Sequence, residues 1–239
     1  MGTSSSYTAP TTTDWSRFKA SVTRFVNGNG GPGEVLGGYV AAQGGAAAAG
    51  GQAAPIKQSA SRLGSFLSSA AQGFDAALEE HGLADVIGQS FETVVSALVD
   101  WIAGPANTQE AVAAREAVAE VLVDIFAEAE DDPTLFDAIA RDQISESLIE
   151  QALLDIVEKW ILKDVWRRGG SQVEQQSLSA SELRQKEQEL RAFLSEAVKF
   201  NFGQYSQINL MEANWSSPEV VRIIDELVVS SLEIFGVQE

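Results

Sequence analysis

The chain lacks cysteine and has a single histidine among its 239 residues. Without cysteine there is no disulfide framework, no thiol nucleophile and no thiolate ligand for zinc or an iron–sulfur cluster. Serine–histidine–aspartate catalysis and multi-histidine metal sites would both depend on His81 alone. The residues therefore nominate no self-consistent catalytic set, and we expect a protein that is not an enzyme and needs no cofactor or metal.

Positive charge is also scarce: 16 Lys and Arg residues face 34 Asp and Glu residues, for a formal charge of -18. Such a charge opposes binding to phosphate backbones, so we expect no direct nucleic-acid partner. The best apolar stretch, Val94 to Ala103, is interrupted by Asp100 and falls short of the roughly 20 residues that span a bilayer. The N-terminus lacks the basic start and apolar core of a signal peptide. We expect a cytoplasmic protein with no membrane partner.

Three regions of different composition follow one another along the chain. Residues 1–13 carry no charge and little apolar area, which predicts a disordered N-terminal tail. Residues 14–52 predict a short helix with Asp14 as its N-cap, a linker at Asn27 to Gly33, and a Gly/Ala-rich helical arm. Residues 53–239 predict an acidic helical body. This division suits a helical body, residues 53–239, that carries residues 14–52 as an N-terminal arm.

The Gly/Ala-rich residues 34–52 permit two interpretations. Small residues allow close contact between helices, whereas paired glycines cost about 1 kcal/mol each in a helix and favour a weak helix with frayed ends. The residues alone favour the weak helix.

The rest of the chain shows strong helical periodicity and no alternating strand pattern, so we predict an all-α, multi-helix bundle. The expected helices cover Leu83 to Ala103, a stretch opened by a capping box at Asn107, and Pro133 to Arg168 with a break near residues 142–147. Gly169 to Ser179 is expected to be a loop, followed by a helix capped by Ser179 or Ser181. The last helix, from Pro218, is apolar on more than one face, which indicates central burial or a partner.

The other chemical candidates have simpler explanations. His81 is expected at a helix C-terminus, where an imidazolium on the surface interacts favourably with the helix dipole. The pairs Asp131 with Asp132 and Glu128 with Glu130 resemble carboxylate sites, yet such pairs arise by chance in so acidic a chain. The glycine cluster from Asn27 lacks the Lys-Ser/Thr ending of a phosphate loop.

The N-terminus is the most informative segment. Glycine after Met1 permits removal of the methionine, which leaves Gly2 with an unhindered α-amino group of pKa about 8. Such an amine is a usable nucleophile, although an unstructured start explains the same residues and is favoured by the residues alone. Met-Gly-x-x-x-Ser with Ser6 also matches the N-myristoylation pattern, but a single acyl chain binds membranes only marginally.

Three sequence features together resemble the QatB family, the helical component of the Qat antiphage defence operon. They are the opening Met1-Gly-Thr-Ser-Ser-Ser6, a Gly/Ala-rich helix with Gly37-Gly-Tyr-Val40 and Gly44-Gly45, and the segment from Asn107 to Val118. The resemblance covers the opening and roughly residues 15 to 130, and the C-terminal half matches only as acidic helices. QatB-like chains tend to have a longer Pro-rich tail than this one.

The family resemblance implies partners and a modification site. The family occurs with a P-loop ATPase, a TatD-like DNase and a QueC-like enzyme, which activates a deazapurine carboxylate with ATP and delivers it to a nitrogen nucleophile. If that nucleophile is a protein amine, the resemblance implies that Gly2 receives the 7-deazapurine-type group. The modifying enzyme would then recognise the small tail residues Thr3, Ser4, Ser5 and Ser6.

The function predicted from the resemblance is a non-catalytic defence subunit that is modified at Gly2 and docks its partners. An unmodified helical scaffold, an enzyme dependent on His81 and an N-myristoylated helical protein remain alternatives.

Overall fold

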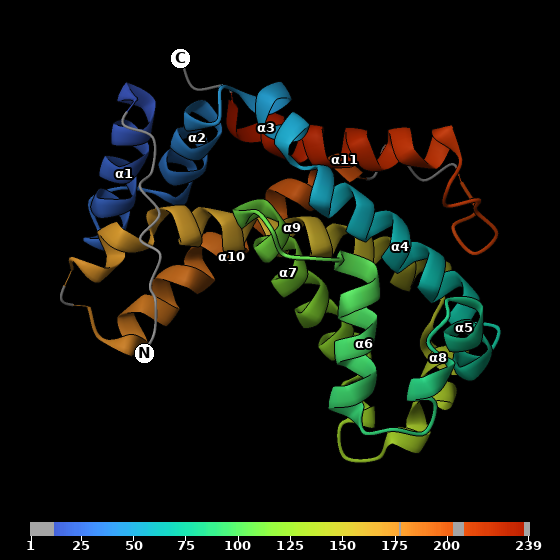
Figure 1. The fold of residues 1–239 in the computed structure, drawn as a ribbon. Coiled ribbons are helices and arrows are strands. Elements are labelled where there is room, and N and C mark those ends of the chain that lie inside the picture. Colours follow the sequence, from blue (N-terminus) through green and yellow to red (C-terminus); the bar gives the residue numbers. More distant parts are fainter. Residues whose placement is uncertain (1–11, 177, 203–207, 237–239) are drawn as a thin grey trace.

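The computed structural model describes residues 12–176, 178–202 and 208–236 and confirms the predicted all-α fold. Within these residues there are α-helices and short 3₁₀ turns but no strand (Figure 1). The α-helices are α1 (Thr13–Val26), α2 (Pro32–Ala42), α3 (Ala46–Gln52), α4 (Ala54–Ala70), α5 (Phe74–Glu80), α6 (Phe91–Ala103), α7 (Gln109–Ile125), α8 (Phe136–Gln143), α9 (Glu146–Glu174), α10 (Ala180–Phe202) and α11 (Pro218–Gly236). The 3₁₀ turns are Ala84–Val86, Ala127–Ala129 and Pro133–Leu135.

Helix α9 is the central element of the fold. It is 29 residues long and contacts α1, α4, α7 and α10 (Figure 1). Its residues are buried on more than one side, including Trp160, Ile161 and Leu162, which follow one another in sequence. A helix covered all round in this way is a core helix rather than a surface helix.

Helix capping agrees with the sequence at some positions and differs at others. The Ser179 side chain accepts a hydrogen bond from the backbone of Glu182, whose carboxylate accepts one from the Ser179 backbone at 2.8 Å, so the predicted cap is confirmed. The N-cap of α1 is Thr12 rather than Asp14, which lies in the first turn. Likewise, Thr108 caps α7 in place of Asn107. In both cases the side chain that caps the helix is a threonine within two residues of the predicted N-cap.

The Gly/Ala-rich region forms two closely packed helices, so the interpretation as a weak, frayed helix was wrong. A methyl group on Gly38 would lie 3.2 Å from the Phe18 backbone, and one on Gly50 would lie 2.6 Å from Val229. Glycine therefore lets α2 approach α1 and lets α3 approach α11. The tertiary contacts outweigh the intrinsic cost of glycine in these helices.

Two further segments differ from the sequence prediction. Helix α9 continues through Gly169 and Gly170 to Glu174 instead of ending in a loop. Gly169 lies against α1, where a methyl group would be 3.1 Å from Val22, so packing on α1 holds the helix together past the two glycines. In the other segment, α6 begins only at Phe91, because Ser90 caps it and Gly88 before it has a φ of +72°. The predicted break between α8 and α9 is confirmed at Ile144, whose backbone is extended.

Helix α11 obtains its apolar cover within the chain. It contacts α2, α3, α4 and α10, and it buries Ile224, Leu227, Val228 and Leu232. Its burial explains most of the wide apolar surface, while Val221 and Ile234 remain exposed. Because α1 also contacts α9, the described part of residues 14–52 packs against the rest of the chain. The division into a tail, an arm and a body stays a prediction.

Candidate functional site

The predicted modification site, Gly2 with Thr3, Ser4, Ser5 and Ser6, lies outside the described residues. The described chain begins at Thr12, which is the base of that segment. The Thr12 hydroxyl oxygen accepts a hydrogen bond from the backbone of Trp15 at 3.5 Å, and the carboxylate of Asp14 pairs with Arg17 at 3.4 Å. A carboxylate in the first turn of a helix is stabilised by the helix dipole. The segment that bears Gly2 therefore joins a capped helix.

Trp15 attaches this first helix to the centre of the fold. Its ring is buried, meets Phe18 edge to face at 5.7 Å, and lies 5.3 Å from the guanidinium of Arg168 on α9. A desolvated cation over an indole ring contributes about 2 kcal/mol. The base of the N-terminal segment is thus held against a buried charged residue.

Arg168 belongs to a buried polar cluster that joins α2, α7 and α9. The hydroxyl of Tyr39 and the Nε of Arg168 both donate to one oxygen of Asp164, each at 2.6 Å, and a second nitrogen of Arg168 reaches Glu110 at the start of α7. Gln43 donates to the Tyr39 oxygen at 3.3 Å. Asp164 is fully buried, and its second oxygen has no hydrogen-bond partner among the described residues. We call these five residues the buried cluster.

The protonation of the buried cluster follows from burial and from the charges that face each other. Burial raises the pKa of Tyr39 well above 10, and the adjacent Asp164 raises it further. Burial by itself lowers the pKa of Arg168, but Asp164, Tyr39 and Glu110 together outweigh burial and the net shift is upward. For Glu110, burial raises the pKa, while a backbone N–H and Arg168 lower it below its usual value. Tyr39 is therefore a neutral donor and Arg168 a cation at physiological pH.

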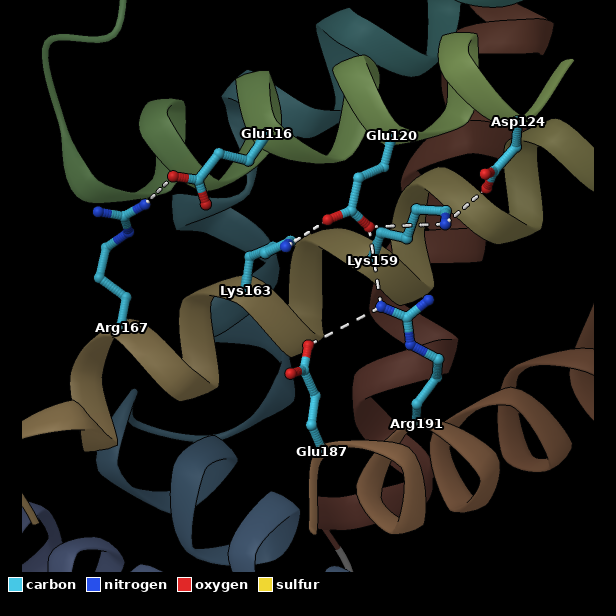
Figure 2. Close-up of polar contacts among 8 residues, drawn as sticks. All are labelled: Glu116, Glu120, Asp124, Lys159, Lys163, Arg167, Glu187 and Arg191. Carbon is cyan, nitrogen blue, oxygen red and sulfur yellow. Dashed lines mark hydrogen bonds and ion pairs between the residues drawn. The ribbon is translucent and has the colours of Figure 1, made fainter. Parts of the chain in front are cut away.

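A row of more exposed ion pairs joins α7 to α9 (Figure 2). Arg167 pairs with Glu116 at 2.6 Å, Lys163 pairs with Glu120, and Lys159 pairs with Asp124 at 2.9 Å. The cations are four residues apart, so they lie along one face of α9. The acids on α7 have the same spacing, and the two helices meet in one register.

Glu120 extends this row to a third helix. It lies 3.6 Å from Lys159 and 3.7 Å from Arg191 on α10, and Arg191 in turn lies 3.9 Å from Glu187 (Figure 2). Glu120 therefore faces three cations from two helices. We call the pairs drawn in Figure 2 the ion ladder.

His81 occupies the predicted position but not the predicted environment. It is the C-cap of α5, yet its ring is half-buried and lies 4.3 Å from the Trp101 ring and 5.9 Å from that of Phe66. Burial lowers its pKa, and the nearby Glu80 opposes that shift. A neutral imidazole between aromatic rings replaces the expected surface imidazolium. No group of three His, Asp or Glu residues in the described ranges is placed to hold a metal.

Sequence reasoning missed both the buried cluster and the ion ladder. A usable signal was present, because Asp164 and Arg168 follow Val157 and Ile161 at helical spacing and so continue an apolar stripe of α9 with two opposite charges. Tyr39 gave no such signal, since its partner is 125 residues away. In chemical terms the buried cluster is closed to a substrate: Tyr39 and Asp164 are at most 1% exposed. Its position suits the attachment of helices to one another.

The fold and these polar contacts define a helical protein in which buried and half-exposed charges join the helices. A family model described as Qat anti-phage system associated protein QatB matches residues 44–235. The match covers more than half of the chain, so this protein belongs to the QatB family and is a component of the Qat antiphage defence system. Searches of curated proteins and of solved structures found no match. Among the described helices, none is long and apolar enough to cross a membrane.

Proposed function

We propose that this chain is a non-catalytic subunit of the Qat system whose Gly2 amine receives a 7-deazapurine-type group from the system's QueC-like enzyme. Family membership supports a role in that system. The observation that carries the proposal is the opening of the chain, where a glycine is followed by Thr3, Ser4, Ser5 and Ser6 and no large side chain precedes Tyr7. Such a segment fits a narrow active site.

The chemistry of the modification is an acyl transfer. ATP activates the carboxylate of the deazapurine, and the Gly2 nitrogen attacks the activated carboxyl carbon. A carbon–nitrogen bond forms, the activating group leaves with the carboxyl oxygen, and the amine gives up a proton. With a pKa of about 8, roughly a tenth of the amine is neutral and nucleophilic at pH 7.

The reach of this amine follows from the chain length. Ten residues lead from Gly2 to Thr12, so the amine lies no more than about 35 Å from the start of α1. The modifying enzyme must therefore bind near the first helix, where Trp15 and Arg168 hold the base of the segment. We further propose that the acidic helical body docks the QueC-like enzyme, the P-loop ATPase and the TatD-like DNase in the cytoplasm.

Intact-mass spectrometry with N-terminal peptide mapping tests the modification. The chain is expressed alone and together with the other Qat components. We expect a mass gain on Gly2 only in the second sample, equal to the acyl group of the deazapurine carboxylic acid. A Gly2→Gln variant keeps Met1, because a large second residue blocks its removal, and the gain should disappear.

A matched variant separates the modification from lipidation. Ser6→Ala removes the hydroxyl that the myristoylation pattern requires and leaves the Gly2 amine in place. We expect the mass gain to persist in this variant. A gain that matches a fatty acyl chain would indicate a lipidated protein, and an unmodified Gly2 in both samples would leave an unmodified scaffold as the better account.

A further inference from the structure

Helices α4 and α11 contact each other and diverge along their length (Figure 1). Side chains of both helices line an open groove of about 730 Å³. The segment before α11 forms one end of the groove and is firmly held. The Trp215 ring lies directly against Gly64, where any larger residue would collide with it. The Ser61 hydroxyl donates to the Trp215 carbonyl at 2.7 Å, and the indole N–H donates to Ser68 at 3.0 Å. The groove is therefore preformed.

The groove is lined by more positive than negative charge. Lys57, Arg62 and Arg222 line it together with a single carboxylate, that of Asp225, which pairs with Lys57. In a chain with twice as many acids as bases, three cations in one groove form a local exception. The electrostatic potential inside the groove consequently favours an anionic group.

Two of these cations have no buried carboxylate partner among the described residues, although Arg62 is held against Trp101 by a hydrogen bond and by a ring contact at 6.0 Å. Arg62 is half-buried, donates to the Trp101 carbonyl at 2.8 Å, and has no carboxylate partner in the described part of the chain. Arg222 pairs with Glu226 on its own helix, but both side chains are exposed to solvent, and exposed pairs contribute little. Guanidinium groups also bind carboxylates with two parallel hydrogen bonds.

The groove also carries an apolar strip. Val221 is 53% exposed, more than Val123, Phe193 or Ile234 among the exposed large apolar residues, and Pro218 lies one helical turn before it. Apolar side chains bordered by charges are typical of surfaces that bind a helix or an extended segment. A nucleic acid fits less well, because its backbone would extend over the acidic surface beyond the groove.

We propose that this groove binds an acidic, amphipathic segment of another Qat protein, with carboxylates on Arg62 and Arg222 and an apolar side chain on Val221. The inference rests on the docking part of the proposed function and not on the modification of Gly2.

Binding of the full-length chain to each purified Qat component tests the groove. Arg222→Glu reverses one charge on an exposed side chain, and we expect it to raise the Kd for one component at least tenfold. Arg141→Glu is the control, because Arg141 has the same 61% exposure and a similar pair four residues away, with Asp137, on the distant helix α8. It should leave the Kd unchanged.

A photo-cross-linking residue at Val221 identifies the occupant. We expect the cross-linked peptide to come from the same component and to be rich in Asp and Glu. A cross-link to a second copy of this chain, equal effects of Arg222→Glu and Arg141→Glu, or no binding to any component would each overturn the proposal. Mapping of Gly2 in the wild-type samples keeps the two proposals apart, because it tests the modification of Gly2 whether or not Arg222→Glu weakens binding.

Discussion

The buried cluster and the ion ladder both connect α9 to α7, yet they differ in how far their acids are removed from water. The side chain of Asp164 is fully buried, whereas that of Asp124 at the far end of the ladder is 65% exposed. In the buried cluster, hydrogen bonds from Tyr39 and Arg168 replace the water that one oxygen of Asp164 has lost. In the ion ladder, water remains a competing partner. The same types of charge on one pair of helices therefore have different energetic roles.

The two sets of contacts also differ in what they connect. Through Tyr39, Glu110 and the ring of Trp15, the buried cluster joins α1, α2 and α7 to a single point on α9. The ion ladder repeats along α7 and α9 and adds α10 through Arg191. The buried cluster thus specifies which helices meet, and the ion ladder specifies their register. The base of the segment that bears Gly2 depends on the buried cluster.

The largest expected effect comes from Asp164→Ala. Removal of this carboxylate leaves the guanidinium of Arg168 with only Glu110 and leaves the Tyr39 hydroxyl without an acceptor. Breaking a buried ion pair in this way destabilises proteins by about 3–5 kcal/mol. Urea denaturation followed by tryptophan fluorescence measures the change in the free energy of unfolding. The measured loss includes the cost of leaving Arg168 and Tyr39 buried without Asp164. It is therefore larger than the net contribution of the intact cluster to stability.

Asp124→Ala is the matched change in the ion ladder. Its carboxylate is largely exposed and Lys159 retains Glu120, so we expect a loss of less than about 1 kcal/mol. Equal losses in the free energy of unfolding for Asp164→Ala and Asp124→Ala would mean that burial does not give the two sets of contacts different energetic roles.

Tyr39→Phe should have an intermediate effect and a distinctive pH dependence. At neutral pH the variant loses a hydrogen bond to a charged acceptor, which costs about 1.5–3 kcal/mol. The folded protein raises the pKa of Tyr39 well above its unfolded value of about 10. Above pH 10 the unfolded tyrosine therefore releases a proton that the folded one retains, and the stability of the wild type falls as the pH rises.

The phenyl ring that replaces the phenol in this variant has no hydroxyl to titrate, so the variant lacks that alkaline loss. We expect the difference in stability between wild type and variant to shrink from pH 9 to pH 11, as measured by urea denaturation at each pH. A difference that stays constant over this range would mean that Tyr39 titrates normally and is not held by Asp164.

Glu120→Gln in the ion ladder should have a small effect that depends on salt, comparable in size to that of Asp124→Ala. The change removes the negative charge that faces Lys159, Lys163 and Arg191, and we expect a loss of about 1 kcal/mol. Added salt screens the partly exposed pairs of Glu120, so part of the loss should disappear as NaCl is raised to about 1 M in the same denaturation experiment, where the screening length is about 3 Å. Glu226→Gln is the control, because among the described residues Glu226 pairs with one cation, Arg222, and the loss of stability should be smaller.

The sequence predicted those parts of the fold that depend on local signals. The serine cap at Ser179 and the stop at Gly104 act within a few residues, and the helical periodicity that follows or precedes them is strong. The continuation of α9 through Gly169 was not predictable in this way. It depends on Val22 and Phe18, which lie far away in sequence and fill the space that a side chain would occupy.

The candidate functional residues divide in the same way, into those that the sequence indicates and those that only the structure brings together. Gly2 and the small residues after it stay a prediction from the sequence, because they lie outside the described residues. The partners of Asp164 and Arg168 were not identifiable from the sequence, since Tyr39 and Glu110 come from two other helices. The groove between α4 and α11 likewise brings together Arg62 and Arg222, which are far apart in the chain.

By itself, the sequence determined that this protein is helical, acidic and poor in the residues of most catalytic centres, and its motifs indicated the family. These properties follow from composition and from periodicity over a few turns. Only the tertiary structure decided that glycines serve close helix packing, that α11 is covered within the chain, and that Asp164 and Arg168 are buried together. Each of these depends on which distant surfaces meet, because burial and pairing are properties of the assembled helices.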